Sequence, residues 1–181
     1  MDRDLVTRAQ HGDGAAFDAI AAALLDRLYR IAYLMLREPE AAEDAVQEAL
    51  VRAWRDLPSL RDPERLEAWM RSLVVHACYD EARRIRRRAP ELTLVSGRDA
   101  EQVDPLRGLA EREILNRAFR RLSIEHRATV VLRHYLELTL PEIAATLRIP
   151  LGTAKSRLHH GERALRAAVE ADDRTARGIA G

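Results

Sequence analysis

Residues 139–166 read TLPEIAATLRIPLGTAKSRLHHGERALR. The spacing of Thr139 and Glu142 is that of a capping box, which predicts the start of a short helix. A break at 148–152 separates this helix from a second one, which is predicted to reach about Val169. Two short helices joined by a tight break, the second of them basic, are typical of a helix-turn-helix.

The second helix of this pair has two distinct faces when its residues are placed at 100° intervals. One face carries Ala154, Leu158, Gly161 and Leu165 and is predicted to pack on the preceding helices. The opposite face and its flanks carry donors that can reach guanine edges or phosphates. The candidate DNA-contacting residues are Thr153, Lys155, Ser156, Arg157, His159, His160 and Arg163. The alternative is a solvated helix face in an ordinary bundle, because helix-turn-helix geometry also occurs in proteins that bind no DNA.

The rest of the chain is also predicted to be helical, because apolar residues recur at spacings of three or four and no segment alternates like a strand. Helices are expected at about 14–36, 40–55 and 64–88, and again from about 111. Residues 90–110 lose this periodicity and contain two prolines and two glycines, a composition typical of a linker. The predicted fold is all-α, with two small helical domains joined by a flexible linker.

Charge is distributed unevenly along a chain whose formal net charge is only +1. Residues 1–57 contain seven Arg and eleven acidic residues, whereas residues 58–89 contain eight Arg and five acidic residues. Residues 111–181 are basic again, with 13 Arg or Lys and nine acidic residues. Two basic blocks predict two surfaces that face a polyanion. The expected parts of the chain are a domain at 1–89, an acidic linker at 90–110, a domain at 111–172 and a frayed tail at 173–181.

Composition and motifs argue against several other classes of protein. The single cysteine, Cys78, excludes an intramolecular disulfide, and no apolar run approaches the roughly 20 residues of a membrane helix. With no apolar leader segment either, we expect a soluble cytoplasmic protein without a membrane partner. His76 and Cys78 are too sparse for a structural zinc site, and no phosphate-binding loop, nucleophile elbow or zinc-protease motif occurs. We therefore expect no catalytic residues, no metal and no cofactor.

Three stretches resemble one known family. LPEIAATLRIPLGTAKSRLHHGERALR (140–166) resembles the promoter-reading domain of bacterial sigma factors, particularly the extracytoplasmic-function (ECF) subgroup of the sigma-70 family. AEDAVQEALVRAW (42–54) is similar to the helix with which these factors bind core RNA polymerase. AWMRSLVVHACYDEARRIRRR (68–88) is similar to the helix that engages the −10 promoter element. The sequence departs from the usual pattern at His76, Ala154 and His160-Gly161; the first and last of these bear on which bases are read.

In the first half of the chain, the resemblance implies two sets of contacts. Residues on one polar face of the 40–55 helix would dock on a coiled coil of the largest polymerase subunit, and an acidic face suits a basic protein partner. These residues are Asp44, Gln47, Glu48 and Arg52. The following loop (57–65) and helix would capture the −10 element and a base flipped from the non-template strand. The candidate residues there are Arg61, His76, Asp80, Arg83, Arg84 and Arg87. Trp54 and Trp69 are expected to pack in the core rather than to stack on bases.

The function that the resemblance implies is that of a sigma factor. Such a protein directs core RNA polymerase, through its largest subunit and flap, to promoter DNA, and helps to open the duplex. An anti-sigma factor is a further partner that the resemblance suggests. The alternatives are an autonomous helix-turn-helix regulator that acts without polymerase, an enzyme that uses His76 and Cys78, and a regulator that binds polymerase without touching DNA.

Overall fold

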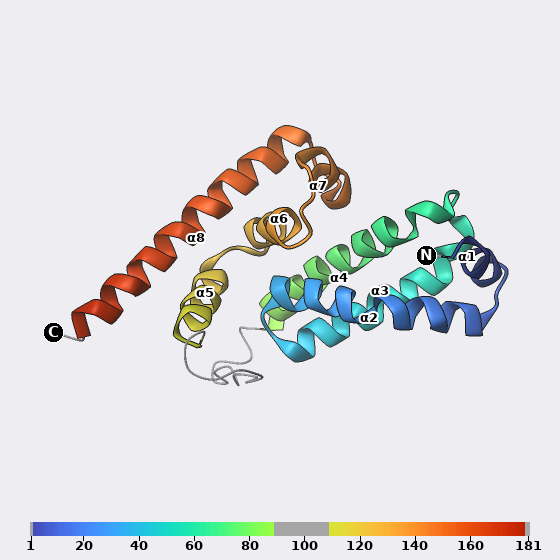
Figure 1. Cartoon of the computed structure of the whole chain (residues 1–181), viewed down its shortest axis with the longest axis horizontal. Helices are drawn as coiled ribbons and strands as arrows, with labels where there is room; N and C mark the ends of the chain where they lie inside the picture. The colour runs from blue at the N-terminus through green and yellow to red at the C-terminus, as the bar shows by residue number, and fades with distance from the viewer. Residues whose placement is uncertain (1, 89–108, 180–181) are drawn as a thin grey trace. The chain divides into compact units, whose positions relative to one another are not determined.

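The computed structural model describes residues 2–88 and 109–179, which fall into two compact units (Figure 1). The first unit lies within Met1–Leu94 and the second within Val95–Gly181. The described residues form helices and turns and contain no strand, which confirms the all-α prediction. The expected linker at 90–110 lies outside the described residues except for its last two positions, which begin a helix.

Residues 2–88 of the first unit form four α-helices, one more than the sequence predicts there. They are α1 (Arg3–Gln10), α2 (Gly14–Leu36), α3 (Pro39–Asp56) and α4 (Leu66–Arg88). Asp13 caps α2 by accepting a hydrogen bond from the amide of Ala16 at 3.1 Å. The C-cap residue Arg37 adopts a left-handed conformation that ends α2, and Pro39 occupies the first turn of α3, where its missing amide leaves no bond unmade. The predicted boundaries of α2, α3 and α4 are each confirmed to within about two residues.

The core of the first unit lies between α2, α3 and α4, which run side by side (Figure 1). A stripe of small residues on α3, including Ala45, Ala49 and Ala53, is at most 1% exposed and lets the neighbouring helices approach closely. In the sequence, Ile85 shares one apolar stripe of the 64–88 helix with Leu66, Met70, Leu73 and Ala77, which predicts that it is buried. This prediction is wrong, because Ile85 is 45% exposed. Burial on α4 reaches only as far as Glu81; residues 83–87 are all exposed, so α4 leaves the core before it reaches Ile85.

The second unit also consists of helices, namely α5 (Leu109–Arg121), α6 (Ile124–His134), α7 (Leu140–Leu147) and α8 (Leu151–Ile179). Ser123 caps α6 through a hydrogen bond from the amide of His126. The predicted capping box of α7 is confirmed: the amide of Thr139 donates to Glu142 at 2.8 Å, and the amide of Glu142 donates to the hydroxyl of Thr139 at 3.5 Å. Two of the unpaired amides at the start of α7 are thereby satisfied.

The turn between α7 and α8 is short and is closed by backbone bonds. Arg148 adopts a left-handed conformation at φ 54°, and the amide of Ile149 donates to the carbonyl of Ala144 at 3.0 Å. The helix α8 extends to Ile179, so the predicted end near Val169 is wrong. Between 153 and 179 the sequence contains no proline and many residues that favour helix, so its composition is compatible with one long helix.

Candidate nucleic-acid interface

The helix α8 divides into a packed face and an exposed face as the 100° spacing predicts. Ala154 is fully buried and Leu158 is 9% exposed, while Leu165 is half-buried. Five of the candidate contact residues are exposed, and the other two, Thr153 and Arg157, are half-buried at the edges of that face. The exposed ones are Lys155, Ser156, His159, His160 and Arg163. The local geometry therefore presents the donor-bearing face of α8 to solvent.

Gly161 lies where α8 packs closely against α6. A Cβ atom at this position would lie 2.9 Å from Cγ2 of Val130 and 3.1 Å from the carbonyl oxygen of His126. Gly161 is accordingly buried against α6. The departure from the family pattern at His160-Gly161 was expected to affect base reading, and the structure separates the two residues: His160 lies on the exposed face, whereas Gly161 serves packing.

The cations on the exposed face of α8 have no partner in the described part of the chain. Neither Lys155 nor Arg157 nor Arg163 makes a hydrogen bond or ion pair with a residue in 2–88 or 109–179. The neighbouring acid, Glu162, accepts instead from Nε2 of His134 at 2.8 Å. The positive charge on this face is thus available to phosphate oxygens or base edges.

Imidazole rings gather beside these cations. The ring centroid of His160 lies 5.6 Å from that of His159 and 6.2 Å from that of His126. Within the described ranges, no group of three or more His, Cys, Asp or Glu side chains could hold a metal ion. The rings add further hydrogen-bond donors and acceptors to the exposed face of α8.

The polar face of α3, unlike the exposed face of α8, is joined to a neighbouring helix, α4, by an ion pair. Asp44 and Gln47 are exposed. Arg52 is held between two carboxylates: its Nε donates to Oε1 of Glu48 at 2.8 Å, and its Nη1 donates to Oδ2 of Asp80 on α4 at 2.9 Å. Asp80 also accepts from Arg83. We call Glu48, Arg52, Asp80 and Arg83 the α3–α4 charge chain.

Within this charge chain, the pKa values of Arg52 and Asp80 are shifted in the directions that favour their charged forms. The hydrogen bond with Glu48 raises the pKa of Arg52, and the bond with Asp80 raises it further, while burial opposes both. Burial alone would raise the pKa of Asp80, but hydrogen bonds from Arg83 and Arg52 outweigh it and hold the pKa below its usual value. Residues that were assigned from the sequence to two surfaces, one for polymerase and one for DNA, therefore belong to one connected network.

The basic end of α4 is only partly available. Arg83 is paired with Asp80, and Nη1 of Arg84 lies 2.8 Å from Oε2 of Glu81. Arg87 is exposed and makes no ion pair within the described residues. His76 is half-buried on the same helix, with its ring centroid 6.5 Å from that of Tyr79.

The loop between α3 and α4 contains two short 3₁₀ turns, η1 (Leu57–Ser59) and η2 (Pro63–Arg65). Leu57 is fully buried and anchors the loop. Arg61 is exposed between the two turns and forms no ion pair with a described residue. The predicted loop at 57–65 is thus an ordered segment with one available cation.

Trp54 lies at the edge of the core rather than inside it. Its ring packs edge-on against Phe17 at a centroid distance of 5.1 Å, yet the residue is 43% exposed. The predicted core position is correct for one side of the ring and wrong for the other. Val51, one turn before Trp54, is 57% exposed, so α3 presents apolar surface beside Gln47.

The enzyme interpretation finds no support at His76 and Cys78. Burial raises the pKa of the Cys78 thiol, and the residue is fully buried. Because the thiolate is the reactive form, such a cysteine is a poor nucleophile.

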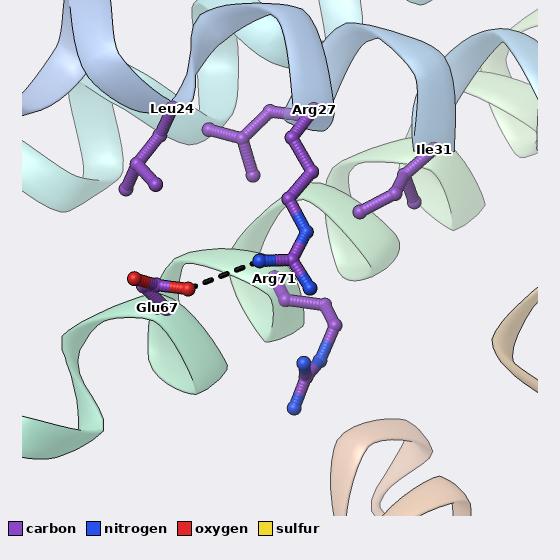
Figure 2. A pocket seen from close by; sticks show the side chains of 6 residues that line it. Leu24, Arg27, Ile31, Glu67 and Arg71 are labelled. Atoms are coloured by element: carbon purple, nitrogen blue, oxygen red, sulfur yellow. Dashed lines mark hydrogen bonds and ion pairs between the residues drawn. The ribbon is translucent and has the colours of Figure 1, made fainter. Parts of the chain in front are cut away.

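A small hollow between α2 and α4 is closed on one side by a salt bridge between Nη1 of Arg27 and Oε2 of Glu67 at 3.0 Å (Figure 2). Its cavity volume of about 10 Å³ is roughly that of one water molecule and far below the roughly 300–1,000 Å³ usual for a small-molecule pocket.

No helix in the described ranges combines the length and apolar character needed to cross a bilayer.

Known proteins resemble this chain along most of its length. Residues 20–88 match the family model Sigma-70 region 2, and residues 112–165 match Sigma-70, region 4. The ECF RNA polymerase sigma factor SigW of Bacillus subtilis is 30% identical over 92% of this chain and 95% of its own length. The ECF RNA polymerase sigma factor SigL of Mycobacterium tuberculosis is 35% identical over 86% of this chain and 92% of its own.

Solved structures share the fold. CnrH, solved with the cytosolic domain of CnrY, superposes with a TM-score of 0.65 and 25% identity and covers 94% of this chain. RpoE of Bartonella quintana, solved with the anti-sigma factor NepR, gives a TM-score of 0.65 at 21% identity over 85% of this chain. Since two family regions match in order and a relative matches along nearly its whole length, the chain belongs to the ECF family of RNA polymerase sigma factors, which direct the polymerase to promoters.

Proposed function

We propose that three surfaces divide the work of this sigma factor. The exposed face of α8 reads the −35 promoter element, the end of α4 with the 57–65 loop binds the −10 element, and the polar face of α3 docks on core RNA polymerase. The observation that carries the proposal is the face of α8, whose cations are exposed and without an acidic partner in the described chain.

The proposed contacts of α8 are of two kinds. Lys155 and Arg163 lie on the exposed face, where they can donate to the acceptors of guanine in the major groove. Arg157, half-buried at the edge, is better placed to hold a phosphate and so to set the register of the helix in the groove. Ser156, His159 and the neighbouring Thr153 and His160 complete the set as shorter donors or acceptors.

At the −10 element the proposed task is to stabilise opened DNA. Unstacking a base costs a few kcal/mol, and contacts to the extruded strand can offset that cost. Arg61 in the loop and Arg87 on α4 are exposed and lack ion-pair partners in the described chain, so they are the first candidates for phosphate contacts. Arg83 and Arg84 would have to exchange a carboxylate for a phosphate.

On α3 the proposed polymerase contacts are Asp44, Gln47 and Glu48. Their acid and amide groups complement a basic coiled coil on the largest polymerase subunit. Arg52 contributes to this surface through Glu48, which it holds in place at 2.8 Å. The exposed Val51 and Trp54 lie next to this face and would lose water-exposed apolar area on docking.

The remaining assignments rest on membership of the family. We propose that residues 1–89 act as the region 2 unit, that 111–172 act as the region 4 unit and contact the polymerase flap, and that 90–110 links them along the path that RNA later takes. The protein acts in the cytoplasm and performs no catalytic step itself. An anti-sigma factor is a proposed partner because one structural neighbour, the sigma factor RpoE, was solved in complex with the anti-sigma factor NepR.

Run-off transcription from a mixed promoter library tests the proposal directly. Core polymerase is assayed with and without this protein, and we expect a defined subset of promoters to be used only when the protein is present. The absence of any promoter-specific initiation would overturn the proposal. Tight binding of the protein alone to palindromic duplex DNA would instead support an autonomous regulator, an alternative that does not explain the match to Sigma-70 region 2.

A further inference from the structure

The first helix, α1, has no role in the function described so far. It precedes the residues that match Sigma-70 region 2, which begin at residue 20. Val6 and Ala9 are buried, at 0% and 2% exposure, so α1 is an integral part of the first unit. It contacts α2 and also both 3₁₀ turns of the loop between α3 and α4.

Gln10, the last residue of α1, joins this helix to the loop. Its side-chain Nε2 donates to the carbonyl oxygen of Leu60 at 2.6 Å and to that of Leu57 at 3.3 Å. An amide nitrogen carries two hydrogens, and both are used on one loop. These bonds connect residues 47 and 50 positions apart in the sequence.

The end of α1, where Gln10 lies, is joined to the start of α2 by an ion pair between Arg8 and Asp13. Arg8 donates to Oδ2 of Asp13 through Nε at 2.9 Å and through Nη2 at 2.6 Å. Asp13 in turn caps α2 with its other oxygen. Gly12 provides the positive φ of 90° that lets the chain reverse between the two helices.

The loop that Gln10 contacts is ordered on the inside and exposed on the outside. Leu57 is buried, and its carbonyl also accepts from the amide of Leu60 at 3.0 Å. Ser59 donates to the carbonyl of Asp56 at 2.6 Å. The exposed positions are Pro58, Ser59, Arg61 and Asp62. Gln10 thus holds the inner carbonyls of a turn whose outer residues face solvent.

We propose that Gln10 is a positioning residue for promoter recognition: by holding the carbonyls of Leu57 and Leu60, it sets the shape in which the loop receives an unstacked base of the −10 element. The inference rests on the proposed function of the loop and adds to it a residue that lies outside the matched family region. Gln10 acts through the loop and does not itself contact DNA.

The physical reason is that reading a base requires a loop of fixed shape. Hydrogen bonds and stacking discriminate between bases only when the groups that make them are already in place. Without the Gln10 side chain, the Leu57–Leu60 turn keeps its backbone bond but loses both side-chain hydrogen bonds from α1. We expect a loss of base preference of about fivefold for each hydrogen bond removed.

The test compares Gln10→Leu and Gln10→Glu with the natural protein, each assembled with core polymerase. Promoters randomised across the −10 and −35 elements are transcribed, and the transcripts are sequenced to obtain the base preference at every position. In both Gln10 variants we expect the base preference to fall at one or two adjacent positions of the −10 element and to stay unchanged across the −35 element. Gln10→Glu should have the larger effect, because a carboxylate cannot donate and repels both carbonyls.

Thr7→Val is the matched control, because it removes a side-chain hydrogen bond that lies within α1, from Thr7 to the carbonyl of Arg3. Partial unfolding lowers transcription from all promoters alike and leaves the preference ratios unchanged. Unchanged −10 preferences in both Gln10 variants would overturn the inference while the proposed function stands. Failure of the natural protein to initiate from any promoter would overturn both.

Discussion

The end of α4 and the exposed face of α8 both carry clustered cations, but the two clusters differ in how many of these cations are paired with acidic residues. On α4, Arg83 and Arg84 are each paired with a carboxylate three residues earlier. On α8, Lys155, Arg157 and Arg163 have no such partner within residues 2–88 and 109–179. The α4 segment looks stronger in the sequence, with five Arg in the six residues 83–88. A count of arginines therefore overstates the charge that a surface can offer to DNA.

Both helices pack through buried apolar residues, but each also makes a distinctive contact with its neighbour. The α3–α4 charge chain links α4 to α3 through Arg52, whereas α8 lies against α6 through the close contact at Gly161. Substitutions of the cations, of the ion-paired residues or of Gly161 should therefore change promoter affinity and stability to different extents in the two helices.

The largest effect is expected on the free face of α8. Lys155→Ala and Arg163→Ala should each cost about 1–3 kcal/mol of promoter affinity if the residue reads a base edge. Arg83→Ala on α4 should cost less, because Arg83 must first leave Asp80. Affinity of the polymerase complex for a promoter fragment at several salt concentrations measures this.

Arg166→Ala is the control for the α8 prediction, because Arg166 is exposed on the same helix but outside the candidate contact set. Equal losses for Arg83→Ala and Lys155→Ala would remove the distinction between paired and free cations.

Gly161→Ala should destabilise the second unit. The added methyl group meets Val130 and the backbone of His126, and such overpacking typically costs about 1–3 kcal/mol. A gain of up to about 1 kcal/mol in helix propensity offsets part of it. Urea unfolding measures the difference, with Gly152→Ala as control, because nothing lies within 4 Å of a Cβ at that position. A Gly161→Ala variant more stable than Gly152→Ala would contradict the close contact.

Arg52→Met should weaken the first unit by about 1 kcal/mol, in the range of partly exposed ion pairs. It leaves Glu48 and Asp80 without their shared cation. A double-mutant cycle with Asp80→Asn isolates the coupling between the helices. Arg55→Met is the matched control, since Arg55 is 69% exposed and pairs with the adjacent Asp56. A coupling energy of zero would show that the charge chain does not stabilise the contact between α3 and α4.

The smallest effect is expected from lowering the pH, which should reduce the contribution of Asp80 to stability. Because the folded-state pKa of Asp80 is depressed, its contribution to stability is complete above the unfolded value of about 3.9 and is lost as the pH falls through the lower folded value. The difference in unfolding free energy between the natural protein and Asp80→Asn should therefore shrink below about pH 4. If the difference stays constant down to pH 2, the contribution of Asp80 to stability does not depend on its negative charge.

Local features of the structure were predictable because neighbouring residues decide them. The capping box at Thr139 and Glu142 and the division of α8 into two faces follow from spacings within one helix. The helix α1 was missed because its eight residues bury only Val6 and Ala9, too few to produce a periodic pattern. The exposure of Ile85 was missed because a helical wheel shows which face a residue occupies and not where the neighbouring helices end.

The amino-acid sequence by itself determined most of the helices, the family and the exposed donors of α8, since capping, periodicity and motif spacing are all properties of short segments. Only the tertiary structure decided which cations are neutralised and which turn is held by which helix. Arg52 and Asp80 are 28 residues apart, and Gln10 and Leu60 are 50 apart. Hydrogen bonds act over about 3 Å, and only folding brings such distant residues within that distance.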